Sequence, residues 1–304
     1  MNIIENHIIP EGVKRARLDS YAFETFDIFP SRKSVKKAIK RGEIMVDGEN
    51  YEPFIRIKPG QTINLIESKK NSHRVYCLEL RILYEDNWIA VIEKPPGLIV
   101  SGNKYKTLGN ALIYNLKGSK QRDALINPRP VHRLDFPTGG LIIAAKTASS
   151  LVHLSRQFQK REIKKRYRAI VIGKLEREGT ICYSLDNKQA ETFFSSVKHY
   201  PSLKSNWLTI VDLWPTTGRY HQLRRHLSMH GYPILGDKLY GVEGKILKGK
   251  GLFLWSVEIS LRHPIYEWQL TIKTREAQKF ELFLNRELRR WKKYHDNEPQ
   301  QVEP

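Results

Sequence analysis

The sequence contains the stretch His132-Arg133-Leu134-Asp135-Phe136-Pro137-Thr138-Gly139-Gly140-Leu141, and an apolar run that we predict as a strand continues to Ala145. It sets one carboxylate, Asp135, between a basic pair and a turn rich in proline and glycine. Arg133 favours the charged form of Asp135, and the turn bends the backbone so that a ligand can come close. Asp and Gly are also common in ordinary loops, so the local alternative is a structural turn. Asp135 is the leading candidate for a reactive group.

A second polar cluster lies far downstream, at Thr217-Gly218-Arg219-Tyr220-His221-Gln222-Leu223-Arg224-Arg225-His226. It repeats the combination of arginine, histidine and glycine found around Asp135, and two such clusters predict one shared site. His226 and His230 are spaced four apart, as metal ligands on a helix can be. They lack the glutamate of the His-Glu-x-x-His pattern and any cysteine partner, so we expect no metal.

Charge points to a polyanionic partner. The chain has 52 Lys and Arg against 32 Asp and Glu, a formal net charge of +20. Cations that neutralise phosphates release counterions, so this excess predicts salt-sensitive binding to nucleic acid. The alternative is a basic surface that binds nothing. No apolar run approaches the ~18 residues of a membrane span, so we expect no membrane partner.

Length and cysteine content indicate the class of protein. The 304 residues allow about two domains, and 40% apolar residues support a core. The N-terminus lacks a basic start followed by an apolar stretch, so export is not expected. Only Cys77 and Cys182 are present, which argues against a disulfide framework. We expect a cytoplasmic protein.

Basic residues crowd into one predicted helix near the N-terminus, without an acid among them. Val35, Ala38 and Ile39 form its narrow apolar stripe, Gly42 ends it, and a strand from Ile44 enters a tight turn. So many cations exceed what solubility needs, and we expect this face to contact RNA or DNA. The predicted RNA-binding residues are Arg32, Lys33, Lys36, Lys37, Lys40 and Arg41.

The rest of the chain alternates between strand and helix patterns. Strands are predicted at 141–145, 167–172, 192–198, 208–213, 252–261 and 266–273, and helices at 108–116, 148–158, 220–229 and 277–291. The fold class is therefore α+β: a mixed, largely antiparallel sheet with flanking helices, plus a small N-terminal α/β domain. The predicted boundaries are an RNA-binding domain at 1–68, a linker at 69–78, a catalytic domain at 79–293 and a disordered tail at 294–304.

The N-terminal segment resembles the small RNA-binding module named after ribosomal protein four of the small subunit. The matching residues are Arg17-Leu18-Asp19, Ser31-Arg32, Ile39-x-x-Gly42-x-Ile44-x-Val46-x-Gly48 and Pro59-Gly60-Gln61-Thr62-Ile63. The match spans about fifty residues, and its signature is mostly a spacing of basic and apolar positions. The resemblance implies RNA binding and no chemistry.

From Tyr84 to the last strand the chain resembles the RluA-type family of RNA pseudouridine synthases. The first motifs are His132-Arg133-Leu134-Asp135-x-x-Thr138-x-Gly140-Leu141, Ala145-Lys146-Thr147 and Lys165-x-Tyr167-x-Ala169. The later motifs are Gly218-Arg219-x-His221-Gln222-Leu223-Arg224-x-His226 and Gly231-x-Pro233-Ile234-x-Gly236-Asp237-x-x-Tyr240-Gly241. The resemblance implies an isomerase that detaches uracil from its ribose at N1, turns it and rejoins it through C5, with no cofactor.

The same resemblance implies roles for individual residues. Asp135 is the catalytic aspartate, acting either as a nucleophile or as a base on the sugar. Tyr167 stacks against the uracil, Arg224 keeps Asp135 ionised, and Arg133 handles the flipped nucleotide. His132, Arg219, His221 and Gln222 shape the pocket or hold phosphate, with a structural role as the alternative for each. The basic residues around Tyr167, namely Lys164, Lys165, Arg166 and Arg168, are expected to follow RNA phosphates.

Three segments depart from the usual pattern of this family. Gly139 replaces a more frequent serine, Glu93 stands where asparagine often precedes Lys94-Pro95, and Leu254-Trp255-Ser256 replaces Leu-His-Ala. None of these changes removes Asp135, Tyr167 or Arg224. They concern loop shape and RNA selection.

Two other functions compete with pseudouridine synthesis. The first is a noncatalytic RNA-binding or ribosome-assembly factor on the same fold, against which the intact catalytic trio argues. The second is a glycosidic hydrolase, which is weaker because no second carboxylate appears in these motifs. For the enzyme, ribosomal RNA of the large subunit is the preferred target and transfer RNA the other candidate. Nothing in the sequence requires more than a monomer.

Overall fold

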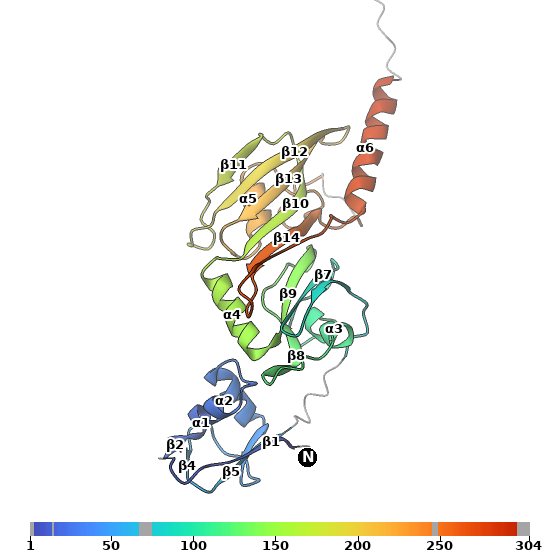
Figure 1. Cartoon of the computed structure of the whole chain (residues 1–304). Helices are drawn as coiled ribbons and strands as arrows, with labels where there is room; N and C mark the ends of the chain where they lie inside the picture. Colours follow the sequence, from blue (N-terminus) through green and yellow to red (C-terminus); the bar gives the residue numbers. More distant parts are fainter. Residues whose placement is uncertain (1–2, 14, 67–74, 245–248, 297–304) are drawn as a thin grey trace, which may run out of the picture.

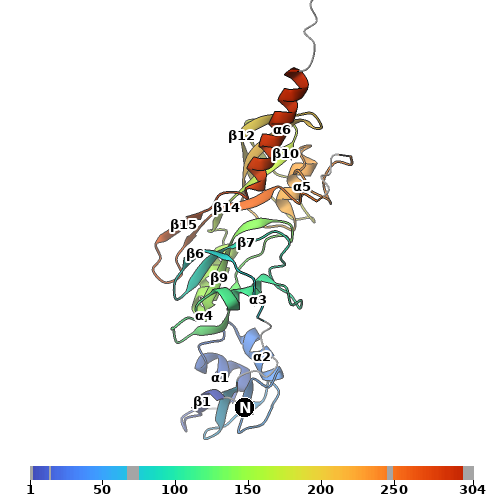
Figure 2. The same ribbon diagram turned by 90° about the vertical axis from the view of Figure 1, so that its right-hand side faces the viewer.

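The computed structural model describes residues 3–13, 15–66, 75–244 and 249–296, which form a small N-terminal module followed by a larger domain (Figures 1 and 2). The module packs two helices against short strands, and β1, β5 and β3 form an antiparallel sheet. Its elements are β1 (Ile3–Ile8), β2 (Ala16–Arg17), α1 (Leu18–Thr25), α2 (Arg32–Lys40), β3 (Ile44–Val46), β4 (Arg56–Ile57) and β5 (Thr62–Ile66).

Capping residues in the local sequence determine where the basic helix α2 begins and ends. Ser31 and Ser34 form a capping box at its start, and Gly42, with φ of 71°, follows its end. Val35, Ala38 and Ile39 are buried in the core of the module, as their spacing predicts. The remaining side chains of α2 therefore point away from this core.

The larger domain is built on one ten-stranded sheet with the order β11-β12-β13-β10-β14-β9-β7-β6, to which β15 and β8 add beside β14 and β9. All pairs are antiparallel except β14 with β9. Its strands are β6 (Arg81–Glu85), β7 (Ile89–Lys94), β8 (Ala124–Pro130), β9 (Gly139–Thr147), β10 (Lys164–Ile172), β11 (Glu178–Ile181), β12 (Thr192–Ser202), β13 (Asn206–Pro215), β14 (Leu254–Arg262) and β15 (Gln269–Lys273). Its helices are α3 (Leu108–Asn115), α4 (Ala148–Gln159), α5 (Gln222–Met229) and α6 (Lys279–Asp296).

Each half of the sheet is covered on both faces, which produces four core clusters in the larger domain. Helix α5 packs Leu223 and Leu227 against one face of β10 and β13, and α6 packs Phe280 and Phe283 against the other face. Helices α3 and α4 cover the half that contains β7 and β9. Figures 1 and 2 show α6 continuing beyond the edge of the sheet.

A short parallel contact between β9 and β14 joins the two halves of the sheet. It pairs Gly139 with Trp255 and Gly140 with Ser256. A Cβ at Gly139 would overlap the Trp255 ring, and one at Gly140, whose φ is 108°, would overlap the Ser256 backbone. Glycine is required here because the chains approach too closely for a side chain. Asp135 lies four residues before this seam.

The predicted α+β class and its largely antiparallel sheet are confirmed, and every predicted strand and helix occurs with shifted ends. Helix α6 continues to Asp296, so the prediction that disorder begins at residue 294 is wrong for 294–296; residues 297–304 lie outside the described residues. The predicted linker falls mostly outside them too, at 69–74. The strands that were not predicted are β1, β2, β4, β5, β6, β7, β8 and β11. No described helix is long and apolar enough to cross a membrane.

Candidate active site

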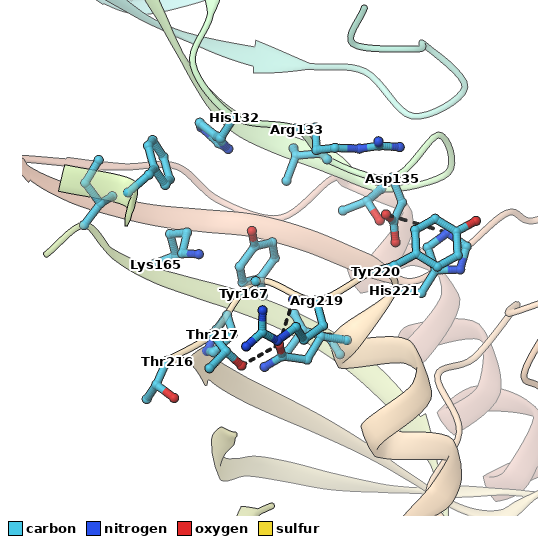
Figure 3. A pocket seen from close by; sticks show the side chains of 18 of the residues that line it. His132, Arg133, Asp135, Lys165, Tyr167, Thr216, Thr217, Arg219, Tyr220 and His221 are labelled. Carbon is cyan, nitrogen blue, oxygen red and sulfur yellow. Dashed lines mark hydrogen bonds and ion pairs between the residues drawn. The ribbon is translucent and has the colours of Figure 1, made fainter. Parts of the chain in front are cut away.

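A cavity of about 950 Å³ lies where the loop after β8, strand β10 and the start of α5 meet (Figure 3). Its lining includes every residue predicted for the site: Asp135, Tyr167, Arg224, Arg133, His132, Arg219, His221 and Gln222. The two polar clusters, more than eighty residues apart in the sequence, therefore share one cavity as expected. Figure 3 shows Asp135, Tyr220 and His221 together at one side of it and His132 and Lys165 toward the other.

Backbone hydrogen bonds hold the loop that carries Asp135. The N–H of Thr138 donates to the carbonyl of Asp135, and the N–H of Gly97 donates to the carbonyl of Phe136 at 2.7 Å. The Asp135 side chain is 20% exposed, with Oδ2 3.7 Å from Nη1 of Arg224 and Oδ1 3.8 Å from Nε2 of His221. Both distances exceed a hydrogen bond, so the carboxylate has the Arg224 cation and the His221 ring beside it, and among the described residues no side chain hydrogen-bonds to its oxygens.

Arg224 is buried and forms its shorter ion pair with Asp237, in addition to the longer one with Asp135. Its Nε and Nη2 donate to the two carboxylate oxygens of Asp237, each at 2.7 Å. Burial alone would raise the pKa of Asp237, but the bonds from Arg224 and from backbone N–H groups outweigh it, so that pKa is lowered. Asp237 thus fixes Arg224, whose Nη1 lies 3.2 Å from Nε2 of His221 and 3.7 Å from Oδ2 of Asp135.

Tyr167 lines the cavity from β10 and is also part of the core around α5. It is paired across the sheet with Leu213 on one side and Ser256 on the other. Burial raises the pKa of its phenol, and the charge of Asp135 raises it further. The phenol is therefore neutral at neutral pH, and it can donate or accept a hydrogen bond only as the uncharged group.

His221 begins α5 in a left-handed conformation, with φ of 51°. Its ring stacks on Tyr220 at 3.8 Å between centroids, and its Nδ1 bonds to the hydroxyl of Tyr240 at 3.0 Å. Burial lowers the pKa of His221, while the charge of Asp135 opposes that shift. A non-glycine residue held at positive φ is a mark of functional or structural constraint.

Two of the predicted pocket residues have their polar atoms engaged by the protein. Gln222 accepts from Thr217 and from the N–H of Arg219, and donates to Glu191 and Thr192. His132 accepts the N–H of Ile143 at its Nε2. Burial, aided by the charge of Lys165, lowers the pKa of His132 to about 3, so its ring is neutral. Both contacts favour the structural role that was the alternative for these two residues.

Arg133 and Arg219 remain available for an anion. Arg133 is exposed at the rim of the cavity, and within the described parts of the chain its side chain makes no hydrogen bond or ion pair. Arg219 uses only Nε, which donates to the carbonyl of Gln189. Guanidinium groups that keep most of their N–H donors for a ligand are well suited to bind phosphate.

The expectation for Arg166 and Arg168 is wrong, because both are held in ion pairs. Arg166 pairs with Asp212 and Glu258, and Arg168 pairs with Asp212 and Glu276. Lys164 and Lys165 differ from them in lining the cavity. Alternation along β10 places Lys165 on the cavity face with Tyr167 and turns Arg166 and Arg168 to the opposite face, but it does not account for Lys164.

Lys94 was not predicted as a site residue. Its side chain is fully buried at the end of β7, and Nζ donates to the carbonyls of Pro95 and Leu98 at 2.9 Å. This ties down the turn whose Gly97 N–H holds the Asp135 loop. Burial lowers the pKa of Lys94 to about 8, and the charge of Asp135 opposes that shift. The only sequence signal was the Lys-Pro pair itself.

The six basic residues of the N-terminal module divide into two groups. Arg32 and Lys36, together with Arg17, surround the buried carboxylate of Asp19, and Arg41 pairs with Glu43. Three of the six predicted cations, Arg32, Lys36 and Arg41, are therefore engaged by acidic side chains from outside α2. Exposed lysines without an acidic partner among the described residues are Lys33, Lys37 and Lys40.

Comparison with known proteins shows the family of this chain. Residues 88–229 match the family model "RNA pseudouridylate synthase". The chain is 30% identical over 283 residues to an uncharacterized RNA pseudouridine synthase of Aquifex aeolicus, with 84% of this chain and 88% of the relative covered. The chain therefore belongs to the RNA pseudouridine synthase family, and it is of the RluA type. The enzyme is an isomerase, and the noncatalytic and hydrolytic alternatives are set aside.

Relatives with more specific names match over similar lengths. The ribosomal large subunit pseudouridine synthase D of Pseudomonas aeruginosa is 35% identical, covering 77% of this chain and 76% of the relative. The dual-specificity RNA pseudouridine synthase RluA of Haemophilus influenzae is 37% identical, covering 61% and 88%. The solved structure of human RNA pseudouridylate synthase domain containing 1 is similar in fold, with a TM-score of 0.55, 24% identity and coverage of 66% and 85%.

Proposed function

We propose that Asp135, Tyr167 and Arg224 perform the isomerisation of uridine in this cavity. The bond between N1 of uracil and C1′ of ribose breaks, and a bond between C5 and C1′ forms. The proton of C5 leaves and N1 gains one, so the product is an isomer of the substrate. Asp135 acts on the sugar as nucleophile or base, both of which need the ionised carboxylate.

The observation that carries this proposal is the position of the Asp135 carboxylate and its contacts. It lies in the cavity, 3.7 Å from the guanidinium of Arg224, and neither oxygen accepts a hydrogen bond from the part of the chain that the structure describes. Arg224, fixed by Asp237, stabilises that charge from one side, and Tyr167 offers a neutral ring to the uracil.

Arg133 and Arg219 hold the flipped nucleotide in this scheme. A base must leave its stack before the enzyme can reach C1′, and an exposed arginine at the rim can occupy the gap or grip the backbone. His132 and Gln222 support the walls of the cavity. His221 lies beside Asp135 and contributes to its position.

The substrate that we propose is large-subunit ribosomal RNA. The names of several relatives, such as the enzyme of Pseudomonas aeruginosa, support this choice, although the name of the Haemophilus influenzae relative shows that specificity varies. The proposed domain limits are 1–68 for an RNA-binding module of the ribosomal protein four type and 79–296 for the catalytic domain. Lys33, Lys37 and Lys40 are the proposed RNA contacts of the module, acting in a cytoplasmic monomer.

The experiment is a comparison of pseudouridine sites in ribosomal and transfer RNA from cells with and without the gene. Chemical tagging of pseudouridine followed by mass spectrometry identifies each site. We expect large-subunit sites to disappear in the deletion and to return with the wild-type gene. Loss confined to transfer RNA would refute the proposed target, and no loss in either RNA would refute both.

A further inference from the structure

The turn between β14 and β15 exposes three large apolar side chains at one point. Ile265 is 42% exposed, Tyr266 is 55% and Trp268 is 46%. Single exposed hydrophobic residues are normal on protein surfaces, but adjacent ones on a single turn form a patch. None of the three lines the catalytic cavity.

A buried histidine holds these rings in place. The ring of His263 stacks with Tyr266 at 4.8 Å and with Trp268 at 5.7 Å between centroids. Its Nδ1 accepts the backbone N–H groups of Ile265 and Tyr266, and its Nε2 donates to Asp86 at 2.8 Å. Trp88 packs edge-on against the same group. The exposed rings are therefore fixed in orientation before any ligand arrives.

The turn is also anchored beside the catalytic cavity. The side chain of Gln157, near the end of α4, donates to the carbonyl of Arg262 and accepts its N–H. The next two residues of the chain, Phe158 and Gln159, line the cavity. Figure 1 shows the β14–β15 turn close to α4.

Basic side chains occur both on the cavity wall and in the segments next to the turn. The exposed basic residues of this region are Lys160, Arg161, Lys164 and Arg262, and the acids among them are Glu162 and Glu267. Arg161 and Lys164 line the cavity directly. An RNA strand that leaves the cavity on this side meets phosphate-binding groups first and the aromatic turn next.

We propose that Tyr266 and Trp268, stacked with His263, form a platform for an unpaired base of the RNA substrate outside the catalytic cavity. The inference rests on the proposed function, since it takes RNA as the ligand. Every base has a π face, and a rigid aromatic group binds it with little loss of conformational entropy. The platform strengthens RNA binding and leaves the chemical step unchanged.

The test compares the Tyr266→Ala/Trp268→Ala double variant with wild type, using an unmodified transcript of large-subunit ribosomal RNA as the probe. Filter binding over a series of salt concentrations gives Kd and its salt dependence. We expect Kd to rise about tenfold or more, in keeping with the effect of removing stacked rings. The slope of log Kd against log salt should stay unchanged, because no phosphate contact is lost.

Two further variants sharpen the result. Trp268→Phe keeps an aromatic ring, so its Kd should remain within about threefold of wild type. Tyr114→Ala removes a ring that is 50% exposed on α3 and should leave Kd unchanged. Turnover at saturating RNA should match wild type for all of them. Thermal unfolding verifies that each variant is folded.

An unchanged Kd in a folded double variant would overturn the proposal, and so would an equal effect of Tyr114→Ala. Unchanged RNA binding with a loss of modification in cells would point to a protein partner on this turn, which also overturns it. Failure of the proposed function has a different signature: the wild-type protein would form no pseudouridine, whatever its affinity for RNA.

Discussion

Gly139 lies directly against the indole ring of Trp255, leaving no room for a Cβ between the strands β9 and β14. From the sequence, both positions depart from the pattern that we expect of the family, with serine expected at 139 and histidine at 255. The two departures are therefore in contact, and the missing side chain at 139 accommodates the larger ring at 255. The seam that they form lies just after the loop that carries Asp135.

Gly139→Ser should disturb this seam. The new side chain overlaps a buried ring, so we expect a loss of about 1–3 kcal/mol in the free energy of unfolding and a fall in turnover. Trp255→His in the same chain removes the overlap and should restore much of both. A double-mutant cycle from urea unfolding measures the coupling. Additive effects of the two changes would show that the contact does not explain the departures.

Asp237→Asn should impair catalysis through Arg224. The amide removes the charge that holds a buried guanidinium, so we expect about 3–5 kcal/mol less stability and at least a tenfold fall in turnover. The control is Asp186→Asn, which alters the exposed pair with the neighbouring Arg225 and should change stability by less than about 1 kcal/mol. Equal turnover of the two variants would contradict the role given to Asp237.

His132 makes stability depend on pH in the acidic range. Its pKa is about 3 in the folded protein and near its ordinary 6.5 in the unfolded chain. As pH falls from 6.5 toward 3, the unfolded chain binds a proton that the folded protein does not. The free energy of unfolding therefore falls by up to about 1.4 kcal/mol per pH unit from this group. Above pH 6.5 the effect is absent.

The variant His132→Gln isolates this effect, because its amide oxygen can accept the N–H of Ile143 but does not titrate. Urea unfolding at several pH values gives the stability of both proteins. Between pH 6.5 and pH 5, wild type should lose about 2 kcal/mol more than the variant. Parallel curves would mean that His132 is not buried in its neutral form.

The lysines of α2 should contribute charge to RNA binding. Lys33→Ala/Lys37→Ala/Lys40→Ala is expected to weaken binding to the ribosomal RNA transcript and to reduce its salt slope by about three. The corresponding triple change to arginine keeps the charge and should keep the slope. Because none of the three lysines has an ion-pair partner within the described ranges of the chain, stability should stay the same. An unchanged slope in the alanine variant would remove α2 from the RNA surface.

Sequence patterns predicted the architecture well where they were periodic. The long strands and the amphipathic helices were found because their apolar spacing follows the face that they bury. Strands β8 and β11 were missed, since the first has two prolines and the second is short and polar. Their pairing depends on neighbours that are distant in the sequence.

The sequence predicted which residues form the site, but it predicted only some of their roles. The motifs identified which side chains meet, including Asp135, Tyr167 and Arg224. The roles of other residues depend on partners that only the tertiary fold brings together. Asp237 accepts hydrogen bonds from Arg224, and the N–H of Ile143 donates to His132. Lys94 was missed because burial of a lysine can be recognised only when the surrounding turn is known.

The most direct test of the central claim uses purified wild-type protein and Asp135→Asn with large-subunit ribosomal RNA from cells that lack the gene. The measurement is pseudouridine formed per enzyme in a single turnover, with Kd for the same RNA determined in parallel. We predict product with wild type and none with the variant, at a Kd within about twofold of wild type. Product formation by Asp135→Asn at a rate near that of wild type would contradict the assignment of Asp135 as the catalytic residue.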